Sequence, residues 1–416
     1  MLDTATGTAV APKASANERV RVPASAARCP RSVTVRALDV LASLELACLL
    51  LVLLGVLTWL GTLAQVELGL YEAQKRYFDS LGLVHRAGPI PIPLPGGMSV
   101  LALLAVNLVL GGIVRLRRGV AALGVLIAHV GILMMLAAGL VKAWFAEEGH
   151  TTLYEGQRSA HFESWHRWEL AILEPLSDGG VREHLVPEER FAAATGERPA
   201  RIESDALPFT VEVTHFLANC EPSPKRPGSD VDAPAIDGVF LRAKPRDPTA
   251  ERNIAGACVA IVDRSTGARR QDLTWAAERA PFVVEAQGRR FAIELRRERY
   301  PMPFVLELAD FHKEDHPGTA MARSFESDVV VVEGPASRPV RISMNQPLRA
   351  GGLVVYQASW GPSNARPGDR LFSTFAVVRN PSDQWPLWSC IVITLGLLLH
   401  FTRKLVRHIR SEARAA

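Results

Sequence analysis

The stretch LGVLIAHVGILMMLAAGL, residues 123–140, is the strongest indication of a membrane protein in this chain. It is apolar throughout except for one histidine, His129. A run of about 20 apolar residues crosses the hydrocarbon core of a bilayer as a helix. An imidazole at that depth costs several kcal/mol unless its nitrogens find partners. The sequence therefore predicts a membrane helix that carries a polar side chain with a role of its own.

Three further apolar runs have the same character, at residues 44–63, 98–114 and 386–401. We predict four transmembrane helices, over residues 38–64, 98–114, 120–142 and 386–404. The second run is short enough to suit a buried core helix, but its length still meets the lower limit of about 17 residues for a span. A hydrophobic fraction of 48% beside 22% charged residues indicates a membrane protein with a large polar part. The net charge of +4 gives no indication of nucleic-acid binding.

Basic residues flank these runs in three clusters, and positive charge near span ends stays in the cytoplasm. The clusters are Arg19, Arg21, Arg28, Arg31 and Arg36; Arg115, Arg117 and Arg118; and Arg403, Lys404, Arg407, Arg410 and Arg414. Four spans place all three clusters on one side. We therefore expect both termini in the cytoplasm, with residues 1–37 a disordered basic tail and 405–416 a second basic tail. Residues 65–97 and 143–385 then lie outside.

The outer block, residues 143–385, changes from long apolar runs to short alternating ones. Alternation with β-branched and aromatic residues is typical of half-buried strands. We expect strands at residues 209–216, 289–300, 304–314, 327–334, 339–345 and 352–360, and a long loop at 221–238. The predicted fold class is an α+β membrane protein, with four transmembrane helices plus one large extracytoplasmic β-rich domain, sandwich- or barrel-like.

The outer segment 65–97 contains apolar residues at helical spacing. Leu70, Tyr77, Leu81 and Val84 would share one face of a helix over residues 69–84. That amphipathic helix either lies flat on the membrane surface or packs on the outer domain. Both alternatives stay open.

Two of the five cysteines, Cys220 and Cys258, belong to the outer block. In an oxidising compartment they could form a disulfide. Because they lack the spacing of a redox or zinc motif, the state of these two thiols stays open.

His129 lies about nine residues from the cytoplasmic end of its helix, which is roughly 14 Å deep. It could form an interhelical hydrogen bond to a backbone carbonyl or to Asn107, act in a proton relay, or serve as an axial ligand to haem iron. His400 lies near the cytoplasmic end of the fourth helix, roughly 10 Å away in depth. One iron therefore does not take both imidazoles. A contact with a phosphate or propionate suits His400 better.

Two outer groups are weaker candidates. His150, His161 and His166 follow the third span, but their irregular spacing favours a solvated surface over a metal site. Tyr356, Trp360 and Gly361 could form a surface on which a ligand stacks, and a buried strand end followed by a turn is the favoured interpretation.

Several motifs, in order along the chain, resemble the ResB (CcsB, plastid Ccs1) family of the system II cytochrome c maturation pathway. The first span resembles the family's at its end, with Gly61 and Thr62, and the third resembles its span with an intramembrane histidine. EEGHTTLYEGQ contains Glu155 and Gly156, and LLLHFTRKLV resembles the closing span. The most specific stretch, ISMNQPLRAGGLVVYQASWG, contains Asn345, Pro347, Tyr356, Gln357, Trp360 and Gly361. Parts of residues 181–274 and the N-terminal tail match no family motif.

The resemblance implies a membrane subunit that carries haem b outward and presents it with apocytochrome c for thioether attachment to CxxCH cysteines. It implies a polytopic ResC/CcsA-type partner, a possible thioredoxin-like thiol reductant, and the inner membrane of a bacterium with the large domain in the periplasm. The chain alone is not expected to be catalytic. The family's haem-binding histidine corresponds to His129, with His400 a second candidate and an opposite axial ligand expected from another subunit. Arg115, Arg117 and Arg118 could pair with propionates, although setting the topology is their favoured role.

Two other classes of protein remain as alternatives. A membrane-anchored ligand-binding sensor or scaffold would be expected to have a cytoplasmic output domain. A proton or ion transporter would be expected to have carboxylates within its spans, and the chain offers Asp39 and Glu45 near one span end. A haem absorption spectrum distinguishes the three classes.

Overall fold

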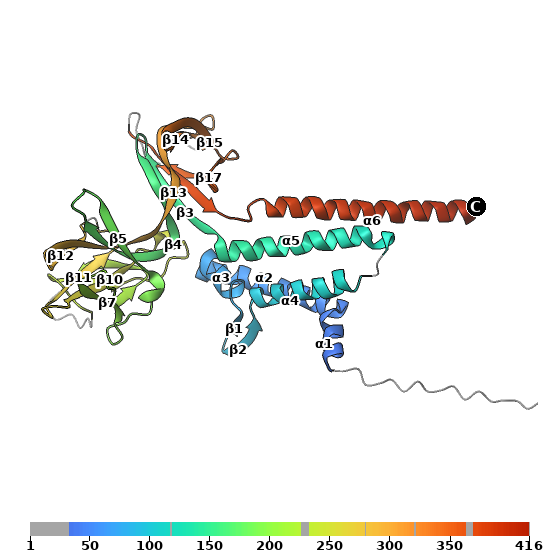
Figure 1. The fold of residues 1–416 in the computed structure, drawn as a ribbon, viewed down its shortest axis with the longest axis horizontal. Helices are drawn as coiled ribbons and strands as arrows, with labels where there is room; N and C mark the ends of the chain where they lie inside the picture. The colour runs from blue at the N-terminus through green and yellow to red at the C-terminus, as the bar shows by residue number, and fades with distance from the viewer. Residues whose placement is uncertain are drawn as a thin grey trace, which may run out of the picture.

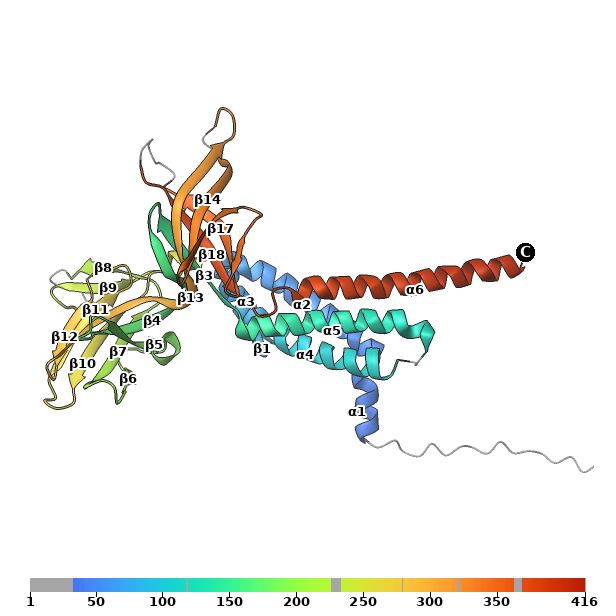
Figure 2. The same cartoon turned by 45° about the horizontal axis from the view of Figure 1, so that its top comes forward.

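The computed structural model describes residues 33–116, 119–225, 233–278, 280–319, 322–362 and 369–415. Long helices occupy one end of the molecule and two β-rich lobes occupy the other (Figure 1). Figure 2 shows the same separation from a second direction, with the lobes splayed apart beyond the helices.

Eight helical segments precede, interrupt and follow the strands in the described part of the chain. They are α1 (Val33–Leu41), α2 (Leu44–Leu68), α3 (Leu70–Tyr77), α4 (Gly97–Asn107), the π-helix η1 (Leu108–Val114), the short 3₁₀ helix η2 (Val120–Ala122), α5 (Leu123–Phe145) and α6 (Trp385–Ala415). Two further 3₁₀ turns, η3 (Glu188–Arg190) and η4 (Ala250–Arg252), lie among the strands.

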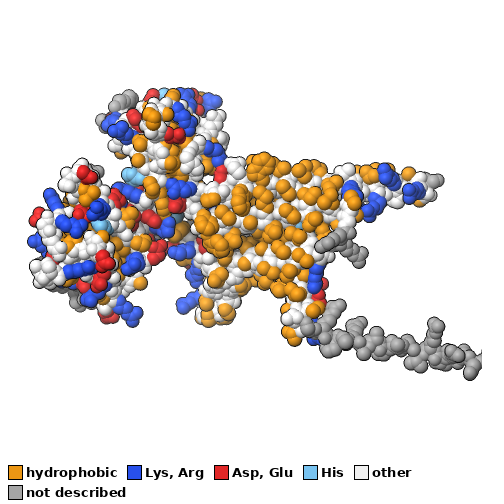
Figure 3. Space-filling model, in the orientation of Figure 1, with side chains coloured by type: hydrophobic (Ala, Val, Ile, Leu, Met, Phe, Trp, Pro, Cys, Tyr) orange, Lys and Arg blue, Asp and Glu red, His pale blue; other side chains and the backbone are white. Residues whose placement is uncertain are grey.

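Four helical stretches in this part of the chain are long and apolar enough to cross a membrane. They are Leu44–Leu68, Gly97–Val114, Val120–Phe145 and Trp385–Ala415. On the face shown in Figure 3, apolar side chains cover the helical end, whereas charged side chains gather on the lobes. The prediction of four spans beside a β-rich part is confirmed.

Small residues bring α5 and α6 into backbone contact. Gly124, Ala128 and Gly131 on α5 are buried, as is Gly396 on α6. A Cβ on Gly396 would lie 2.6 Å from the backbone nitrogen of Ala128. In a membrane such close approach replaces the hydrophobic effect as the source of helix association. The α5/α6 pair is therefore held by close backbone packing, which the small residues allow.

The strands of the described residues form one ten-stranded antiparallel sheet and three smaller sheets. The large sheet runs in the order β15-β14-β13-β4-β3-β18-β17-β16, with β12 paired to β13 and β5 paired to β4. Its strands are β3 (Glu147–Tyr154), β4 (Arg158–Pro175), β5 (Val181–Pro187), β12 (Phe282–Ala286), β13 (Arg289–Asp315), β14 (Ala322–Glu333), β15 (Ala336–Ser343), β16 (Leu348–Ala350), β17 (Leu353–Gly361) and β18 (Phe372–Arg379).

The smaller sheets have the order β11-β10-β7-β6, the hairpin β8-β9 and the hairpin β1-β2. Their strands are β1 (Gly82–Ala87), β2 (Ile90–Pro95), β6 (Ala200–Ile202), β7 (Phe209–Leu217), β8 (Cys220–Pro224), β9 (Val239–Ala243), β10 (Gly256–Asp263) and β11 (Arg269–Trp275).

Two hydrophobic cores divide the β-rich part into two lobes. The first lobe is built on Phe209, Val259 and Phe291, and the second on Phe162, Leu306 and Phe375, all fully buried. The long strands β4 and β13 contribute to both cores and so join the lobes. The single domain expected from the sequence thus has two separately packed halves.

The expected amphipathic helix over residues 69–84 is wrong in its extent. The helix α3 ends at Tyr77, and Gly82 already begins the β1-β2 hairpin. Leu70 is exposed whereas Tyr77 is buried and bonded to His85, so the four apolar residues do not share a face. The alternative of packing on the outer domain fits α3, because Tyr71 stacks on His166 and Glu72 pairs with Arg246.

Other expected boundaries also change. Residues 33–37, expected in the disordered tail, form part of α1, while residues 1–32 lie outside the described residues. Residues 405–415 continue α6, since this stretch contains neither proline nor glycine. Of the loop expected at 221–238, the beginning is β8 and residues 226–232 are outside the described residues. The strands expected at 289–300 and 304–314 form the single strand β13.

Candidate functional site: an intramembrane imidazole

His129 lies on α5 against the π-helix η1. Its Nδ1 is 3.0 Å from the carbonyl oxygen of Gly112. A Cβ on Gly112 would lie 3.2 Å from the same nitrogen, so a side chain there would crowd the ring. The interhelical hydrogen bond considered from the sequence therefore exists, and its partner is a backbone carbonyl.

The end of η1 explains why that carbonyl is available. The last carbonyls of a helix have no partner within it, and η1 ends at Val114. Gly111, which precedes Gly112, packs closely on the interruption between the helices α1 and α2. A Cβ on Gly111 would lie 2.6 Å from the Ala42 carbonyl oxygen. Gly111 thus lets one side of η1 pack on the interruption between α1 and α2, and Gly112 lets the other side pack on His129.

Asn107, the other partner considered for His129, is used elsewhere. Its side-chain amide donates to the carbonyls of Leu41 and Ser43, each at 2.8 Å. Those carbonyls flank the break between α1 and α2, where the regular helical pattern stops. Asn107 therefore stabilises the break, and the π-helix that follows it positions Gly112.

The hydrogen bond to Gly112 defines which nitrogen of His129 is available. A neutral imidazole carries one proton, and a carbonyl accepts only from the protonated nitrogen. We therefore assign the proton to Nδ1, which leaves the lone pair of Nε2. Within the described residues no hydrogen bond reaches Nε2. Iron- and zinc-binding histidines commonly have this arrangement, with one ring nitrogen donating to a carbonyl and the other facing the metal. The site thus fits an axial ligand of haem.

His400 lies at a different level of the helix pair. A Cβ on Gly124 would be 2.7 Å from the backbone nitrogen of His400, which places His400 beside Gly124. Residues 124 to 129 rise roughly 7.5 Å along α5. The next basic residue on α6, Arg403, donates to the carbonyl of Val120. The geometry therefore separates the two histidines and keeps His400 near the basic end of the helices.

Of the arginines between the second and third spans, Arg115 pairs with Asp39 at 2.6 Å across to α1. Arg117 and Arg118 lie outside the described residues. The Asp39 pair gives Arg115 a local role at the helix end.

The three outer histidines are half-buried, whereas their spacing in the sequence favoured a solvated surface. His150 stacks on Trp165 with ring centres 4.0 Å apart, and His166 stacks on Tyr71 at 3.8 Å. Burial lowers the pKa of His150, His161 and His166. A stacked, half-buried ring explains both observations, because desolvation disfavours the charged imidazolium.

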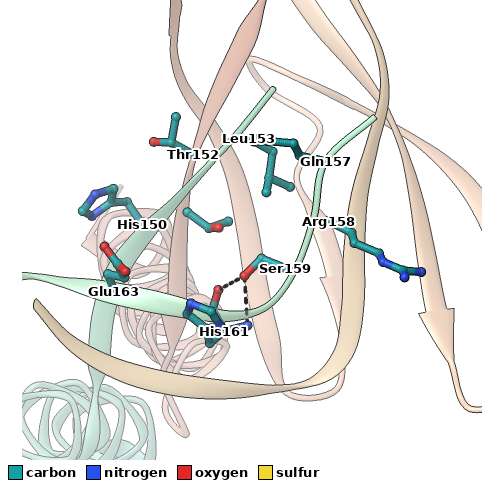
Figure 4. Close-up of a pocket in the computed structure, with 9 residues that line it drawn as sticks. His150, Thr152, Leu153, Gln157, Arg158, Ser159, His161 and Glu163 are labelled. Carbon is teal, nitrogen blue, oxygen red and sulfur yellow. Dashed lines mark hydrogen bonds between the residues drawn. The ribbon is translucent and has the colours of Figure 1, made fainter. Parts of the chain in front are cut away.

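A polar cavity of about 400 Å³ lies between β3 and β4. Figure 4 shows His150 and Thr152 on one strand facing Ser159, His161 and Glu163 on the other. The Ser159 hydroxyl donates to the His161 carbonyl at 2.7 Å and accepts from the His161 backbone nitrogen. Among the described residues no group of three or more candidate ligands is arranged to hold a metal ion.

The residues of the family motifs have structural positions. Gly61 lets the Phe78 ring pack on α2, and Thr62 bonds within the helix to Thr58. Gly156 adopts a positive φ of 80° in the turn after Glu155. Asn345 and Pro347 belong to the turn between β15 and β16.

Near the end of β17 the motif residues pack inside the second lobe. Gln357 accepts from Ser327 at 2.8 Å and donates to Ser373 at 2.6 Å inside the core. Trp360 stacks on Phe311, and the Phe372 ring leaves no room for a side chain on Gly361. Tyr356 is half-buried on the same strand. These contacts give the motif a packing role.

Cys220 and Cys258 are both buried free thiols. Burial raises the pKa of Cys220 to about 12, which keeps it protonated and unreactive. The disulfide considered from the sequence is therefore absent from the structure.

The surroundings of His129 were not predicted from the sequence. The signal was the pair Gly111-Gly112 near the end of an apolar run. Glycines inside a span mark close approach by another segment. Spacing along the chain could not show which segment approaches.

The helices and lobes define a class of membrane protein with four crossing helices, a two-lobed β-rich part and a histidine among the spans. Residues 275–369 match the model of the ResB-like family. The resemblance to ResB proteins is thus confirmed over this segment, which spans β12 to β17 and most of the second lobe. The family fits cytochrome c biogenesis in general. A search among curated proteins finds no match.

Proposed function

We propose that this chain is the subunit of a system II cytochrome c maturation complex that receives haem in the membrane and passes it outward. The observation that carries the proposal is the orientation of His129. Its Nδ1 is bonded to the Gly112 carbonyl, and its Nε2 remains for a ligand. The segment 275–369 supports the same pathway through its family match.

The substrate haem supplies an iron that accepts an imidazole nitrogen, and a flat apolar ring that suits the space between helices. In this proposal His129 holds the iron, while Gly112 orients the imidazole and raises its basicity. The opposite axial ligand comes from another subunit, because His400 lies at a different level. His400 and the nearby Arg403 remain candidates for propionate contact.

The remaining partners follow from the same proposal. A ResC/CcsA-type polytopic protein covers the open faces of the helices and handles haem at the outer surface. The β-rich lobes dock apocytochrome c, whose CxxCH cysteines receive the thioether bonds, and a thioredoxin-like protein keeps those cysteines reduced. An exposed edge strand would capture the unfolded chain by strand addition. The chain itself holds and presents haem, and bond formation belongs to the assembled complex.

We further propose that the protein lies in the inner membrane of a bacterium, with both termini in the cytoplasm and the lobes in the periplasm. The basic residues that follow the apolar part of α6 support this orientation. A membrane-impermeant thiol reagent tests it on a cysteine-free variant with one added cysteine. Labelling in intact spheroplasts is expected at position 179, in the turn after β4, and absent at position 413.

The direct test of the haem proposal compares His129→Ala with His400→Ala in the complex purified with its polytopic partner. Haem content per complex is expected to fall strongly for His129→Ala and to change little for His400→Ala. The amount of partner recovered serves as the control for assembly. An unchanged haem content in His129→Ala, with the complex intact, would reject the ligand role.

A further inference from the structure

The first lobe contains a cavity that the haem proposal does not use. Its volume is about 580 Å³, within the range of about 300–1,000 Å³ typical of small-molecule sites. Phe216, Leu217 and Leu273 line the side formed by the four-stranded sheet, and Phe240 and Leu241 of β9 line the opposite side. It lies within residues 181–274, parts of which match no family motif.

A β-bulge places His215 in the lining of this cavity. On β7, Thr214 is opposite Cys258 and Leu217 is opposite Gly256, so His215 and Phe216 together face the single residue Ala257. His215 also adopts a positive φ of 49°, which is uncommon for residues other than glycine. Bulges and strained residues of this kind occur next to functional sites, where they redirect a side chain.

The two nitrogens of the His215 ring have different surroundings. Nδ1 is inaccessible to solvent and has no hydrogen-bond partner in the described part of the chain. The opposite edge of the ring lies against Gly196, where a Cβ would come within 2.5 Å of Nε2. Gly196 itself lines the cavity. A side chain at that position would therefore displace the imidazole from the cavity wall.

These surroundings determine the chemistry of the site. A buried N–H without an acceptor is rarer than a buried acceptor without a donor, so we assign the proton to Nε2. His215 then offers one N–H donor at the wall of an otherwise largely apolar cavity. Arg242 at the mouth already pairs with Glu221.

We propose that this cavity binds a small apolar ligand that carries an acceptor oxygen, such as a carboxylic acid with an acyl chain or a flat aromatic ring. The apolar walls exclude an inorganic ion or a sugar, because neither would recover its hydration there. His215 accounts for the acceptor oxygen. The site is separate from His129 and does not depend on the haem proposal.

The test uses the full chain in lipid nanodiscs and dodecanoic acid with a diazirine in its chain. After irradiation, peptide mass spectrometry is expected to find adducts on residues that line the cavity, separate from adducts on the spans caused by dissolved probe. The adducts on the spans give an internal control in every sample. Adducts confined to the spans would overturn the proposal.

Two variants and one control give the test its specificity. His215→Gly removes the ring at a positive φ that glycine adopts without strain. Ala243→Trp fills the cavity mouth from an exposed position. Both are expected to lower cavity labelling several-fold and leave span labelling unchanged, whereas His312→Ala, an exposed imidazole of the second lobe, is expected to change neither. Undiminished cavity labelling in both cavity variants would contradict the proposal.

Competition distinguishes the two sources of the ligand. Unlabelled dodecanoic acid and 2-naphthoic acid represent the acyl chain and the flat ring, and the stronger competitor identifies the type of ligand. Dodecane lacks the acceptor oxygen and is expected to compete about fivefold less well than dodecanoic acid, the effect of one hydrogen bond. Equal competition by dodecane would show that His215 donates no hydrogen bond to the ligand, which would contradict the proposal.

Discussion

The membrane helices and the outer lobes solve the problem of buried polar groups in different ways. In the lobes, buried charges are paired, as Arg296 is with Glu169 at 2.8 Å and Glu183 at 2.6 Å. Among the helices, Asn107 donates to two carbonyls, whereas within the described residues only Nδ1 of His129 has a hydrogen-bond partner. The buried charges of the lobes are therefore paired within the chain, whereas Nε2 of His129, like Nδ1 of His215 in the first lobe, has no hydrogen-bond partner among the described residues.

The difference extends to packing. The lobes bury large side chains in two cores, whereas α5 and α6 meet through glycine and alanine. The stability of a lobe should therefore fall most when a large side chain is removed from its core. The pairing of α5 with α6 should be weakened most when a large side chain is added between the two helices.

The largest expected effect is the loss of a core ring in the second lobe. Phe162 is fully buried, and its ring centre lies 5.1 Å from that of Tyr300. Phe162→Ala is expected to lower the free energy of unfolding of the lobe by about 3–5 kcal/mol. Urea unfolding of the full chain, followed by tryptophan fluorescence, measures it. A loss of under about 1 kcal/mol would show that the core is not packed as described.

The next effect concerns the helix pair. Gly396→Leu is expected to separate α5 from α6, since a side chain there meets the backbone of Ala128, and to cost about 1–3 kcal/mol. Gly139→Leu is the matched control, because a Cβ at Gly139 meets nothing within 4 Å. Crosslinking between cysteines placed on α5 and α6 measures the pairing. Equal crosslinking in the two leucine variants would contradict the close contact.

A smaller effect depends on pH and belongs to the lobes and the adjoining α3. Burial lowers the pKa of His150 and His166 in the folded state, so the unfolded chain binds more protons as the pH falls below about 6.5. Stability is therefore expected to fall from about pH 7.5 to about pH 5.5, through the ordinary range of histidine titration.

The variants His150→Phe and His166→Phe keep an aromatic ring in each stack. Each is expected to reduce the fall in melting temperature between the two pH values. A fall that is the same in the wild type and in the double variant would show that these rings do not carry the pH dependence.

The sequence predicted the four spans because each apolar run is about long enough for a helix to cross the hydrocarbon core. It also predicted β7, β13, β14, β15 and β17, since alternation is a local property, whereas the other strands of the described residues were not predicted. It extended the helix at 69–84 too far because Leu81 and Val84 fit helical spacing. Pro93, which pairs with Val84 in the hairpin, comes only later in the chain. Whether one core or two forms depends on which strands pair, and alternation does not determine that pairing.

For the candidate site, residue type and depth identified His129 but not its partner. The hydrogen bond from Nδ1 depends on a carbonyl freed where η1 ends. The pair Gly111-Gly112 indicates a close approach there but does not show which segment approaches. The first-lobe cavity was missed for a related reason. The bulge at His215 arises from the register between β7 and β10, which exists only once the strands are paired.

The central claim is that Nε2 of His129 binds haem iron. The most direct measurement is the absorption spectrum of the His129→Ala complex, recorded before and after imidazole is added. We expect the haem band to be lost or shifted in the variant and largely restored by imidazole, which supplies the missing ligand. A spectrum identical to that of the wild-type complex would contradict the claim.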